Sequence, residues 1–387
     1  MSPKSESQIK VMRIITRMNV GGPAVQVSGL MRNLDRETFE QRLYAGSCAP
    51  DELDYLETSA KDIQVTKVPG LGRHINATSD IRALFFLIKE IREFRPDIIH
   101  SHTAKAGFLG RITSIISGHR SIRIHTFHGH LLNGYFSKTK TDLVVLAEYL
   151  LAKFTTYLLA VGNQVRQDML AKNIGASSKF GVMPPGITLG NPLERIESKV
   201  QLGLDPGKIH CAFIGRITQI KRPDRFLDAV SELRTTAPAV QFFAAGEGDL
   251  YEYMKNRIKQ ESLPVTLLGW QTNIELVLSA SDIVVLTSDN EGTPISLIQA
   301  GMFGIPVVST NVGSVSEIVI HNETGLVTAL APHDIAQAIK LLADNPLLRK
   351  ELGKSALQFT KSNFSSERLS RDHENLYLVL IKNLANS

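Results

Sequence analysis

Short runs of apolar, β-branched residues alternate with longer amphipathic stretches along the whole chain. Such runs are typical of strands buried on both faces of a parallel sheet, and the stretches between them have helical periodicity. The first half contains predicted strands at residues 10–16, 42–46, 64–68, 97–100, 122–126, 157–161 and 180–183. The second half contains predicted strands at 209–214, 240–245, 265–268, 283–286 and 305–309. This pattern predicts α/β architecture with parallel sheets.

A polar stretch separates the two alternations. Pro184-Pro185-Gly186 and residues 189–207 interrupt the pattern, and the chain of 387 residues is long for one hydrophobic core. We therefore predict a first Rossmann-like domain over residues 1–190 and a second over 191–363. The tail contains two further predicted helices, at 346–359 and 366–381.

Composition places the chain among soluble globular proteins, with 43% hydrophobic and 21% charged residues. Cys48 and Cys211 form neither a disulfide framework nor a Cys-x-x-Cys metal pair, so a reducing cytosol is expected. The first ten residues lack a long apolar stretch, which predicts no signal peptide. The longest apolar region, 143–161, contains Glu148 and Lys153, so it is predicted to be a core helix followed by a strand.

Positive charge is concentrated in the first half. Residues 1–190 carry 24 Lys and Arg against 16 Asp and Glu, whereas residues 191–387 carry 19 against 22. Basic stripes with interleaved aromatic residues are missing, so no nucleic-acid partner is expected. The predicted helix 79–94 combines an apolar group with flanking cations, namely Leu84, Phe85, Leu87, Ile88 and Ile91 with Arg82, Lys89, Arg92 and Arg95.

A basic amphipathic helix of this kind can lie in the interface of an anionic bilayer. We therefore expect a cytoplasmic protein that also associates peripherally with the inner face of the plasma membrane. The alternative is that helix 79–94 packs on the sheet while its charges face water, which leaves Phe85, Phe86 and the cations as the exposed candidates.

Residues 283–317 contain a strand, a turn, a helix, a second strand and a second turn. Thr293 is predicted as the N-cap of the helix and Pro294 as its first residue. A helix that begins at the carboxyl end of a buried parallel strand directs free N–H groups and a positive dipole toward that point. This predicts an anion site, most naturally for phosphate, which involves Gly292, Thr293, Pro294, Ile295 and Ser296.

Charged side chains near this site indicate the kind of ligand. A carboxylate such as Glu291 beside bound phosphate is unfavourable unless it binds hydroxyl groups, so we predict a nucleotide sugar. Arg216 and Lys221 lie in one strand-to-helix loop and suit a diphosphate, although they could also be solvated loop cations. Arg222 and Arg225 are interpreted as surface charges.

Two histidine clusters, HSHTAKAG (100–107) and HTFHGH (125–130), each follow a predicted strand. They could bind zinc, but no His-Glu-x-x-His helix or cysteine pair accompanies them. The glycine loop containing Gly21 and Gly22 follows the first strand and allows backbone to approach a ligand. A Gly-x-Gly-x-x-Gly fingerprint is missing, so a dinucleotide cofactor is not expected.

The stretch 283–317 resembles the signature of retaining glycosyltransferases of family 4, which have the GT-B fold. The matching residues are Ser288, Glu291-Gly292, Pro294, Gly304, Pro306-Val307-Val308, Thr310, Gly313 and Glu317-Ile318-Val319. The family has two glutamates eight positions apart, and Gln299 stands where the second is expected. The alternative is an ordinary βαβ unit with a solvated acidic loop.

The resemblance implies two Rossmann-like domains with a cleft between them and a C-terminal helix, 364–387, that returns to the first domain. It also implies that Arg216 and Lys221 hold the donor diphosphate and that position 299 contacts the ribose. Further roles follow from the family: Glu247 lies beside the donor, Trp270 near the base, His128 near the transferred sugar, and His100, His102 and Lys105 on the acceptor side.

The resemblance implies transfer of a sugar from a nucleotide diphosphate sugar, with uridine as the expected base, to a hydroxyl of a glycan or lipid-linked glycan. Glu291 and His128 are the expected catalytic residues, anomeric configuration is retained, and neither cofactor nor metal is expected because an Asp-x-Asp motif is missing. Two alternatives are a GT-B-fold sugar-nucleotide epimerase and a non-catalytic nucleotide-sugar-binding subunit, the latter prompted by Gln299.

Overall fold

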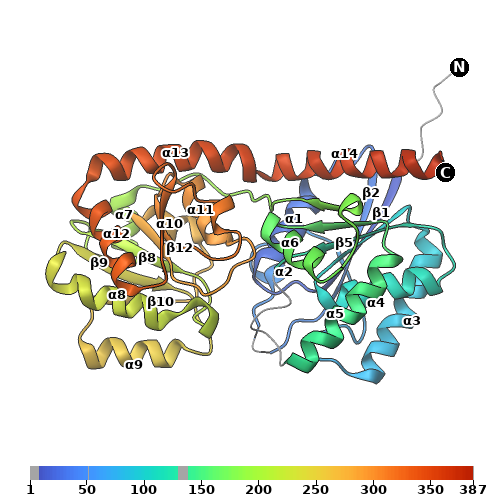
Figure 1. Ribbon diagram of the computed structural model, residues 1–387, viewed down its shortest axis with the longest axis horizontal. Helices are drawn as coiled ribbons and strands as arrows, with labels where there is room; N and C mark the ends of the chain where they lie inside the picture. The colour runs from blue at the N-terminus through green and yellow to red at the C-terminus, as the bar shows by residue number, and fades with distance from the viewer. Residues whose placement is uncertain (1–7, 51, 130–137, 387) are drawn as a thin grey trace, which may run out of the picture. The chain divides into compact units, whose positions relative to one another are not determined.

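The computed structural model describes residues 8–50, 52–129 and 138–386 (Figure 1). The chain divides into two compact units. Unit 1 contains the residues up to Ile187 together with the C-terminal segment from Ser366, and unit 2 contains Thr188–Ser365. In each unit, parallel strands alternate with helices, which confirms the predicted pair of Rossmann-like α/β domains.

Unit 1 contains a seven-stranded parallel sheet with the order β3-β2-β1-β4-β5-β6-β7. Its strands are β1 (Ile9–Arg17), β2 (Phe39–Gly46), β3 (Val65–Lys67), β4 (Ile98–His102), β5 (Ile122–Phe127), β6 (Tyr157–Ala160) and β7 (Phe180–Val182). Its helices are α1 (Gly22–Asn33), α2 (Tyr55–Thr58), α3 (Ala77–Phe94), α4 (Ala104–Ile116), α5 (Lys138–Lys153), α6 (Asn163–Ala171), the 3₁₀ turn η1 (Ser177–Lys179) and α14 (Ser366–Ala385).

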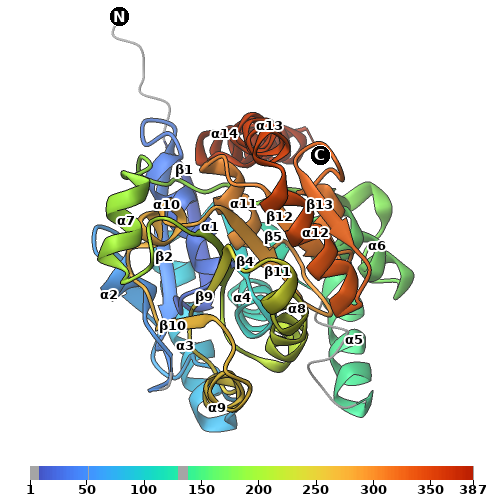
Figure 2. The ribbon, with the colours of Figure 1, turned by 90° about the vertical axis from the view of Figure 1, so that its left-hand side faces the viewer.

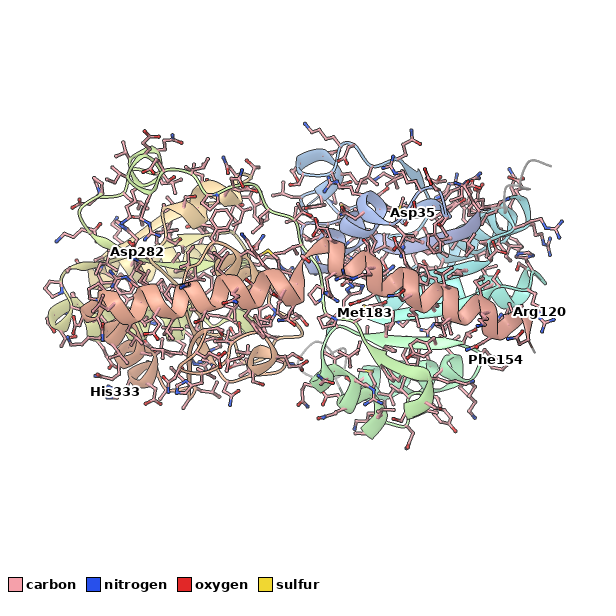
Figure 3. The ribbon with its side chains drawn as sticks, turned by 90° about the horizontal axis from the view of Figure 1, so that it is seen from above. Asp35, Arg120, Phe154, Met183, Asp282 and His333 are labelled. Atoms are coloured by element: carbon pink, nitrogen blue, oxygen red, sulfur yellow. The ribbon has the colours of Figure 1, made fainter. Side chains whose placement is uncertain are left out.

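The helix α14 belongs to unit 1 although it ends the chain, as the family resemblance implies. Its residues Leu369 and Tyr377 are completely buried and pack in one core cluster with Val11 of β1 and Met183. Asp35, which is labelled with Met183 in Figure 3, donates its backbone N–H to Glu374 of α14 at 2.8 Å. Helix α14 therefore covers part of the sheet face that α1 begins to cover.

Unit 2 contains a six-stranded parallel sheet with the order β10-β9-β8-β11-β12-β13. Its strands are β8 (Ile209–Ile214), β9 (Val240–Ala245), β10 (Val265–Gly269), β11 (Ile283–Leu286), β12 (Val307–Thr310) and β13 (Gly325–Thr328). Its helices are α7 (Arg195–Gln201), α8 (Pro223–Thr236), α9 (Tyr251–Glu261), α10 (Ile274–Ser279), α11 (Ile295–Met302), α12 (Pro332–Asp344) and α13 (Pro346–Phe364), with 3₁₀ turns η2 (Gln219–Lys221) and η3 (Val315–Glu317).

Both faces of the unit 2 sheet are buried. Cys211 and Phe213 of β8 pack in one cluster with residues of α8 and α12, which lie side by side (Figure 2). Successive residues of a strand point to opposite faces, and Ala212 between them is equally buried. Helix α11 contacts β11 and β12 and packs on α13, and it belongs to the helices that cover the other face of the sheet. This double cover explains the continuous apolar runs in the sequence.

Helix α5 differs from the predicted core helix, because one side of it faces water. Leu143, Leu146 and Leu150 are 63%, 53% and 47% exposed, whereas Glu148 is buried and accepts two hydrogen bonds from Arg111 of α4 at 2.8 and 2.7 Å. Periodicity alone did not show which side of the helix faces the sheet. No helix among the described residues is long and apolar enough to cross a membrane.

Candidate active site

The strand order of the unit 2 sheet reverses between β8 and β11, which are hydrogen-bonded neighbours. In open α/β sheets the loops that leave the carboxyl ends of two such strands diverge, and ligands bind between them. The loop after β8 contains Arg216 and Lys221, and the loop after β11 contains Glu291. The sheet thus brings together the charged residues that the sequence predicts around the donor.

Glu291 and Lys221 form an ion pair at this point. Lys221 Nζ donates to Glu291 Oε1 at 2.5 Å, and Ser288 Oγ donates to the same oxygen at 2.5 Å. The side chains of Lys221 and Glu291 are 20% and 10% exposed, so both are shielded but still reachable from solvent. Partial burial strengthens the electrostatic interactions that each charge can make with a ligand.

The backbone of Glu291 is supported by the loop after β12. Gly313 has a φ of 52°, and a Cβ atom there would lie 1.8 Å from the carbonyl oxygen of Glu291. The same oxygen accepts a hydrogen bond from Ser314 N at 3.3 Å. Glycine is required at position 313 because only a residue without a side chain allows this close approach.

The loop after β8 is held to the loop after β11 by hydrogen bonds. Thr287 Oγ1 donates to the carbonyl oxygen of Lys221 at 2.9 Å, and Asp289 N donates to that of Ile220 at 2.9 Å. Arg216 is exposed, and its side chain makes no hydrogen bond or ion pair with any residue that the structure describes. Its guanidinium is therefore available for a phosphate.

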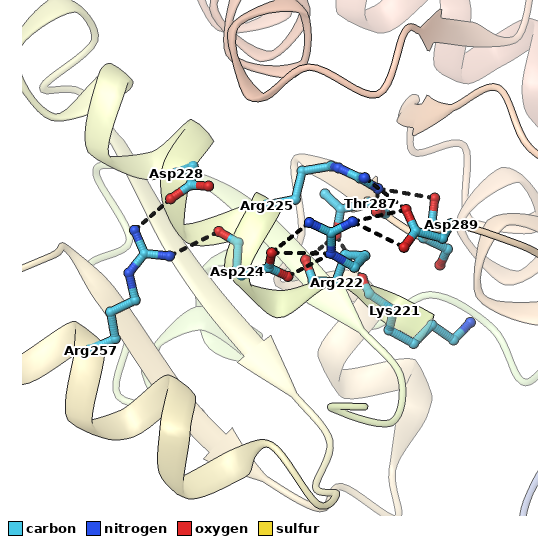
Figure 4. Close-up of polar contacts among 9 residues, drawn as sticks. Lys221, Arg222, Asp224, Arg225, Asp228, Arg257, Thr287 and Asp289 are labelled. Atoms are coloured by element: carbon cyan, nitrogen blue, oxygen red, sulfur yellow. Dashed lines mark hydrogen bonds and ion pairs between the residues drawn. The ribbon is translucent and has the colours of Figure 1, made fainter. Parts of the chain in front are cut away.

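The interpretation of Arg222 and Arg225 as surface charges is wrong (Figure 4). Arg225 is buried and donates to the carbonyl oxygen of Thr287 at 2.6 Å and to Asp289 Oδ1 at 2.7 Å. Arg222 is half-buried and pairs with both Asp224 and Asp289, and its hydrogen bond lowers the pKa of Asp224. These arginines satisfy the carbonyl groups and the carboxylate that follow β11, so they fix the loop instead of facing solvent.

Helix α11 begins one residue later than predicted. Pro294 is its N-cap, with no side-chain capping bond, so Thr293 lies outside the helix. The shift moves the first free N–H groups to Ile295 and Ser296, which are half-buried. Gln299 lies one turn further on the same helix and is also half-buried.

Glycines pack the loop after β9 tightly against the loop after β8. A Cβ atom at Gly246 would lie 2.0 Å from the carbonyl oxygen of Gly215, and Gly246 N donates to the carbonyl oxygen of Gly269 at 2.8 Å. Glu247 is exposed beside this contact, and its Oε1 accepts from Trp270 N at 3.4 Å. Trp270 Nε1 is buried and has no hydrogen-bond partner among the described residues.

In unit 1 the residues of the expected acceptor side are shielded from solvent or paired. His100 and His102 are completely buried, because β4 is a central strand covered on both faces. Lys105 pairs with Asp80 at 2.5 Å and donates to the carbonyl oxygen of His74 at 2.5 Å. His100 and Lys105 therefore use polar atoms within unit 1, whereas Nε2 of His102 has no partner among the described residues, and the acceptor side stays a prediction.

His128 follows β5 and is half-buried. Its Nε2 lies 3.0 Å from Nδ1 of His102, and burial lowers the pKa of His128 to about 3. A neutral imidazole is therefore available at neutral pH. Among residues 8–50, 52–129 and 138–386 no group of three His, Cys, Asp or Glu side chains could hold a metal ion, and His130 of the zinc alternative lies outside these ranges.

The glycine loop after β1 has an accessible backbone. Gly21 is the N-cap of α1, and Gly22 and Pro23 form its first turn, all three half-buried. Atoms at 4.0 Å are the nearest that a Cβ atom at Gly21 would meet. A ligand can therefore approach the N-terminus of α1 here.

Two family models match the chain over most of its length. The model described as "Glycosyltransferase Family 4" matches residues 20–190, and the model described as "Glycosyl transferases group 1" matches residues 194–359. Two Rossmann-like units of this kind define the GT-B class of glycosyltransferases. The chain thus contains a glycosyltransferase family 4 domain followed by a glycosyl transferases group 1 domain.

Solved structures share this fold. An Anabaena protein, HepE, in complex with UDP and glucose matches with a TM-score of 0.80 and 18% identity, over 95% of this chain and 99% of that one. Sucrose-phosphate synthase from Thermosynechococcus elongatus matches with a TM-score of 0.82 and 18% identity, over 98% and 100%.

Curated relatives include bacterial enzymes. The UDP-Gal:alpha-D-GlcNAc-diphosphoundecaprenol alpha-1,3-galactosyltransferase of Escherichia coli is 29% identical over 308 residues, which are 75% of this chain and 76% of that protein. The capsular polysaccharide biosynthesis glycosyltransferase CapM of Staphylococcus aureus is 23% identical over 349 residues, 85% of this chain and 89% of CapM.

Sequence reasoning missed several residues that shape these sites. Arg225 was misread because a cation that binds backbone carbonyls has no sequence pattern of its own. Arg13 and Tyr377, which are completely buried near His100, were not singled out. Arg13 could have been found, since a charged residue within an otherwise apolar strand is unusual, but nothing in the sequence connects Tyr377 with β4.

Proposed function

We propose that this glycosyltransferase moves a sugar from a UDP-sugar to a hydroxyl of a glycan or lipid-linked glycan, with retention of configuration, in the synthesis of a bacterial polysaccharide or glycoconjugate. The observation that carries the proposal is the Lys221–Glu291–Ser288 cluster at the reversal point of the unit 2 sheet. It combines a cation for phosphate with a carboxylate for hydroxyl groups. The activities named for the Escherichia coli and Staphylococcus aureus relatives support the polymer class.

In this proposal Arg216, Lys221 and the N–H groups of Ile295 and Ser296 bind the donor diphosphate. The bond between the anomeric carbon and the phosphate oxygen breaks and its electrons leave with UDP. The acceptor hydroxyl oxygen bonds to the carbon, and its proton passes to the departing phosphate oxygen. Cations and helix N–H groups stabilise the charge that develops on UDP. We propose that these groups suffice without a divalent metal.

Glu291 and His128 are proposed to address the sugar. Glu291 accepts hydrogen bonds from Lys221 and Ser288 through one oxygen, Oε1, and Oε2 makes no hydrogen bond to any residue that the structure describes. That second oxygen is therefore available to a sugar hydroxyl. The neutral ring of His128 can bind another hydroxyl without adding charge beside the donor.

Calorimetric titration with a panel of nucleotide sugars, followed by product analysis with and without GlcNAc-diphosphoundecaprenol, tests the proposal. We expect a UDP-sugar to bind and a glycosylated lipid to form only when the acceptor is present. Conversion of one sugar nucleotide into another without acceptor would identify an epimerase. Binding without donor hydrolysis or transfer to any acceptor would identify a binding subunit.

Gln299 tests how the pocket differs from the family pattern. An amide keeps a hydrogen-bond acceptor but lacks the charge of glutamate. We therefore expect the wild-type protein to be active and to bind the donor more weakly than it would with glutamate at position 299. Gln299→Glu should then leave donor affinity level or increase it, as measured by calorimetry. A large loss of activity in Gln299→Glu would show that the pocket is built around the amide.

We also propose that unit 1 docks on an anionic membrane surface. In α3, Leu87 and Ile91 are buried, but Ile81 and Phe85 are 55% and 67% exposed beside exposed cations. Phe86, the other expected candidate, is half-buried. Helix α5 adds the exposed apolar residues described above and ends near Phe154, which is 54% exposed (Figure 3).

Co-sedimentation with phosphatidylglycerol vesicles should therefore occur at low salt and fade toward roughly 0.5 M salt, because each basic residue near the surface adds only about 1 kcal/mol and salt screens it. Phe85→Ser should weaken binding. Leu347→Ser, which removes an 80% exposed side chain from unit 2, is the matched control and should not. If the protein does not bind these vesicles even at low salt, the proposed membrane docking is wrong, and a soluble acceptor is the better hypothesis.

A further inference from the structure

A buried group of polar side chains connects α14 with the central strands of unit 1. Arg13 of β1, His100 of β4 and Tyr377 of α14 are each completely buried. Arg13 Nη1 donates to the Tyr377 hydroxyl at 2.9 Å, and the same hydroxyl lies 2.6 Å from His100 Nδ1. His100 Nε2 lies 2.7 Å from Thr126 Oγ1.

The donors in this group fix the proton on His100. Arginine can only donate, so the Tyr377 oxygen accepts from Arg13 and directs its own proton to His100 Nδ1. His100 Nδ1 must therefore be unprotonated, and its Nε2–H donates to Thr126. Tyr377, together with Arg13 Nη1 at 3.4 Å from the same nitrogen, thus holds His100 in a single neutral tautomer.

His100 stacks on His102, which in turn contacts His128. The rings of His100 and His102 stack with centroids 4.2 Å apart, and His102 Nδ1 lies 3.0 Å from His128 Nε2. His102 Nε2 is buried without a partner among the described residues, and a buried orphan donor costs more than an orphan acceptor. The proton therefore lies on His102 Nδ1 and is donated to His128, whose own proton is on Nδ1.

Arg13 makes a second contribution, because its charge has no carboxylate partner among the residues that the structure describes. It donates to Gln41 Oε1 at 3.0 Å and to Tyr377, and its Nη1 also lies 3.4 Å from His100 Nδ1; all three partners are uncharged. Burial together with this uncompensated cation lowers the pKa of both His100 and His102, and also that of His373 of α14. His100, His102 and His373 are therefore neutral, and the hydrogen-bond directions described above are kept.

We propose that Tyr377 is a positioning residue for the transfer reaction: it fixes the ring of His100, on which His102 stacks, and thereby the orientation of His128. The C-terminal helix then supplies part of the catalytic geometry in addition to covering the sheet. This inference rests on the proposed function of His128. It predicts that one completely buried hydroxyl on α14 controls turnover.

Tyr377→Phe removes only that hydroxyl, and Tyr44→Phe is the matched control. Tyr44 is also completely buried in unit 1, but its hydroxyl donates to Glu90 at 3.0 Å and does not contact the histidines. We expect Tyr377→Phe to lower kcat about tenfold to 100-fold, as for a misplaced catalytic group, with the Kd for UDP unchanged. Tyr44→Phe should leave kcat within about twofold of wild type.

Two further measurements separate positioning from folding. His102→Asn keeps a donor where Nδ1 lies and should retain more activity than His102→Leu. Long-range ¹H–¹⁵N spectra of protein labelled in histidine should show the Nε2–H tautomer of His100 in wild type and a mixture in Tyr377→Phe. An unchanged kcat and unchanged spectrum in Tyr377→Phe, or equal losses in Tyr377→Phe and Tyr44→Phe, would overturn the proposal.

The spectra need no substrate, so they test the positioning role of Tyr377 separately from the proposed function. A wild-type protein that shows the expected tautomers but neither binds nor transfers from UDP-sugars would refute the proposed function alone. A wild-type protein that transfers sugar while Tyr377→Phe is indistinguishable from it would refute the positioning role alone.

Discussion

Replacing Lys221 with alanine is expected to weaken UDP binding by about 2–4 kcal/mol, roughly 30-fold to 1,000-fold in Kd. Lys221 is partly buried at the end of the loop after β8, where a lost charged hydrogen bond is not replaced fully by water. Arg216→Ala should change the Kd in the same direction. Calorimetry with UDP measures both effects without requiring the acceptor.

Lys255 offers a matched control, because it is a 60% exposed cation on α9 that pairs only with Glu252 of its own helix. Lys255→Ala should leave the Kd for UDP unchanged. Unaltered affinity in both Lys221→Ala and Arg216→Ala would show that the diphosphate binds elsewhere.

Glu291 extends this prediction with an effect of opposite sign. Its carboxylate holds Lys221 at 2.5 Å and adds negative charge beside the proposed phosphate site. Glu291→Gln should therefore leave UDP affinity unchanged or increase it. Turnover should fall about 100-fold or more, because the group that accepts a hydrogen bond from the sugar hydroxyl has lost its charge. His128→Ala should likewise lower turnover more than UDP affinity. If UDP affinity and turnover fall by the same factor, Glu291 and His128 bind the nucleotide part of the donor and not the sugar.

The second large effect concerns acid stability, which unit 1 should lose as its buried histidines protonate on unfolding. Burial lowers the pKa of His128 and of His373 to about 3, compared with about 6.5 in an unfolded chain. Between these values the unfolded chain binds more protons than the folded one, so stability falls as pH decreases below 6.5. From pH 6.5 to 5.0 the two histidines together should lower the free energy of unfolding by about 3 kcal/mol.

Three further histidines of unit 1 act in the same direction, because burial lowers the pKa of His100, His102 and His125 as well. Carboxyl groups whose pKa the fold lowers, such as Asp62, lose their contribution only at lower pH, as they protonate. Glu148 of unit 1 acts in the opposite direction, because burial raises its pKa. The window from pH 6.5 to 5.0 therefore reports the five histidines set against this one carboxyl group.

Urea unfolding at several pH values can separate the two units. Trp270 is the only tryptophan and lies in unit 2, so its fluorescence follows that unit, whereas far-UV circular dichroism follows both. We expect the unit 1 transition to move strongly to lower urea at pH 5.0 and the fluorescence transition to move less. If unfolding of unit 1 at pH 5.5 takes up less than one proton per molecule, the prediction that its buried histidines are neutral in the folded state is wrong.

The sequence itself predicts much of the proposed donor site. Alternating apolar runs predict parallel strands because strand and helix periods are local properties. The carboxyl ends of parallel strands share one edge of a sheet, so residues just after two such strands, Lys221 and Glu291, could be expected to meet. Their contact across 70 positions of sequence follows from this rule.

The tertiary structure alone decided which polar residues are buried. Arg225 turns inward because the carbonyl groups after β11 need a donor. His100 and His102 are covered because helix α14, at the far end of the sequence, packs over the first sheet and places Tyr377 against His100. Local patterns state which residues can form a strand or a helix, but contacts between distant segments depend on which faces of those elements meet.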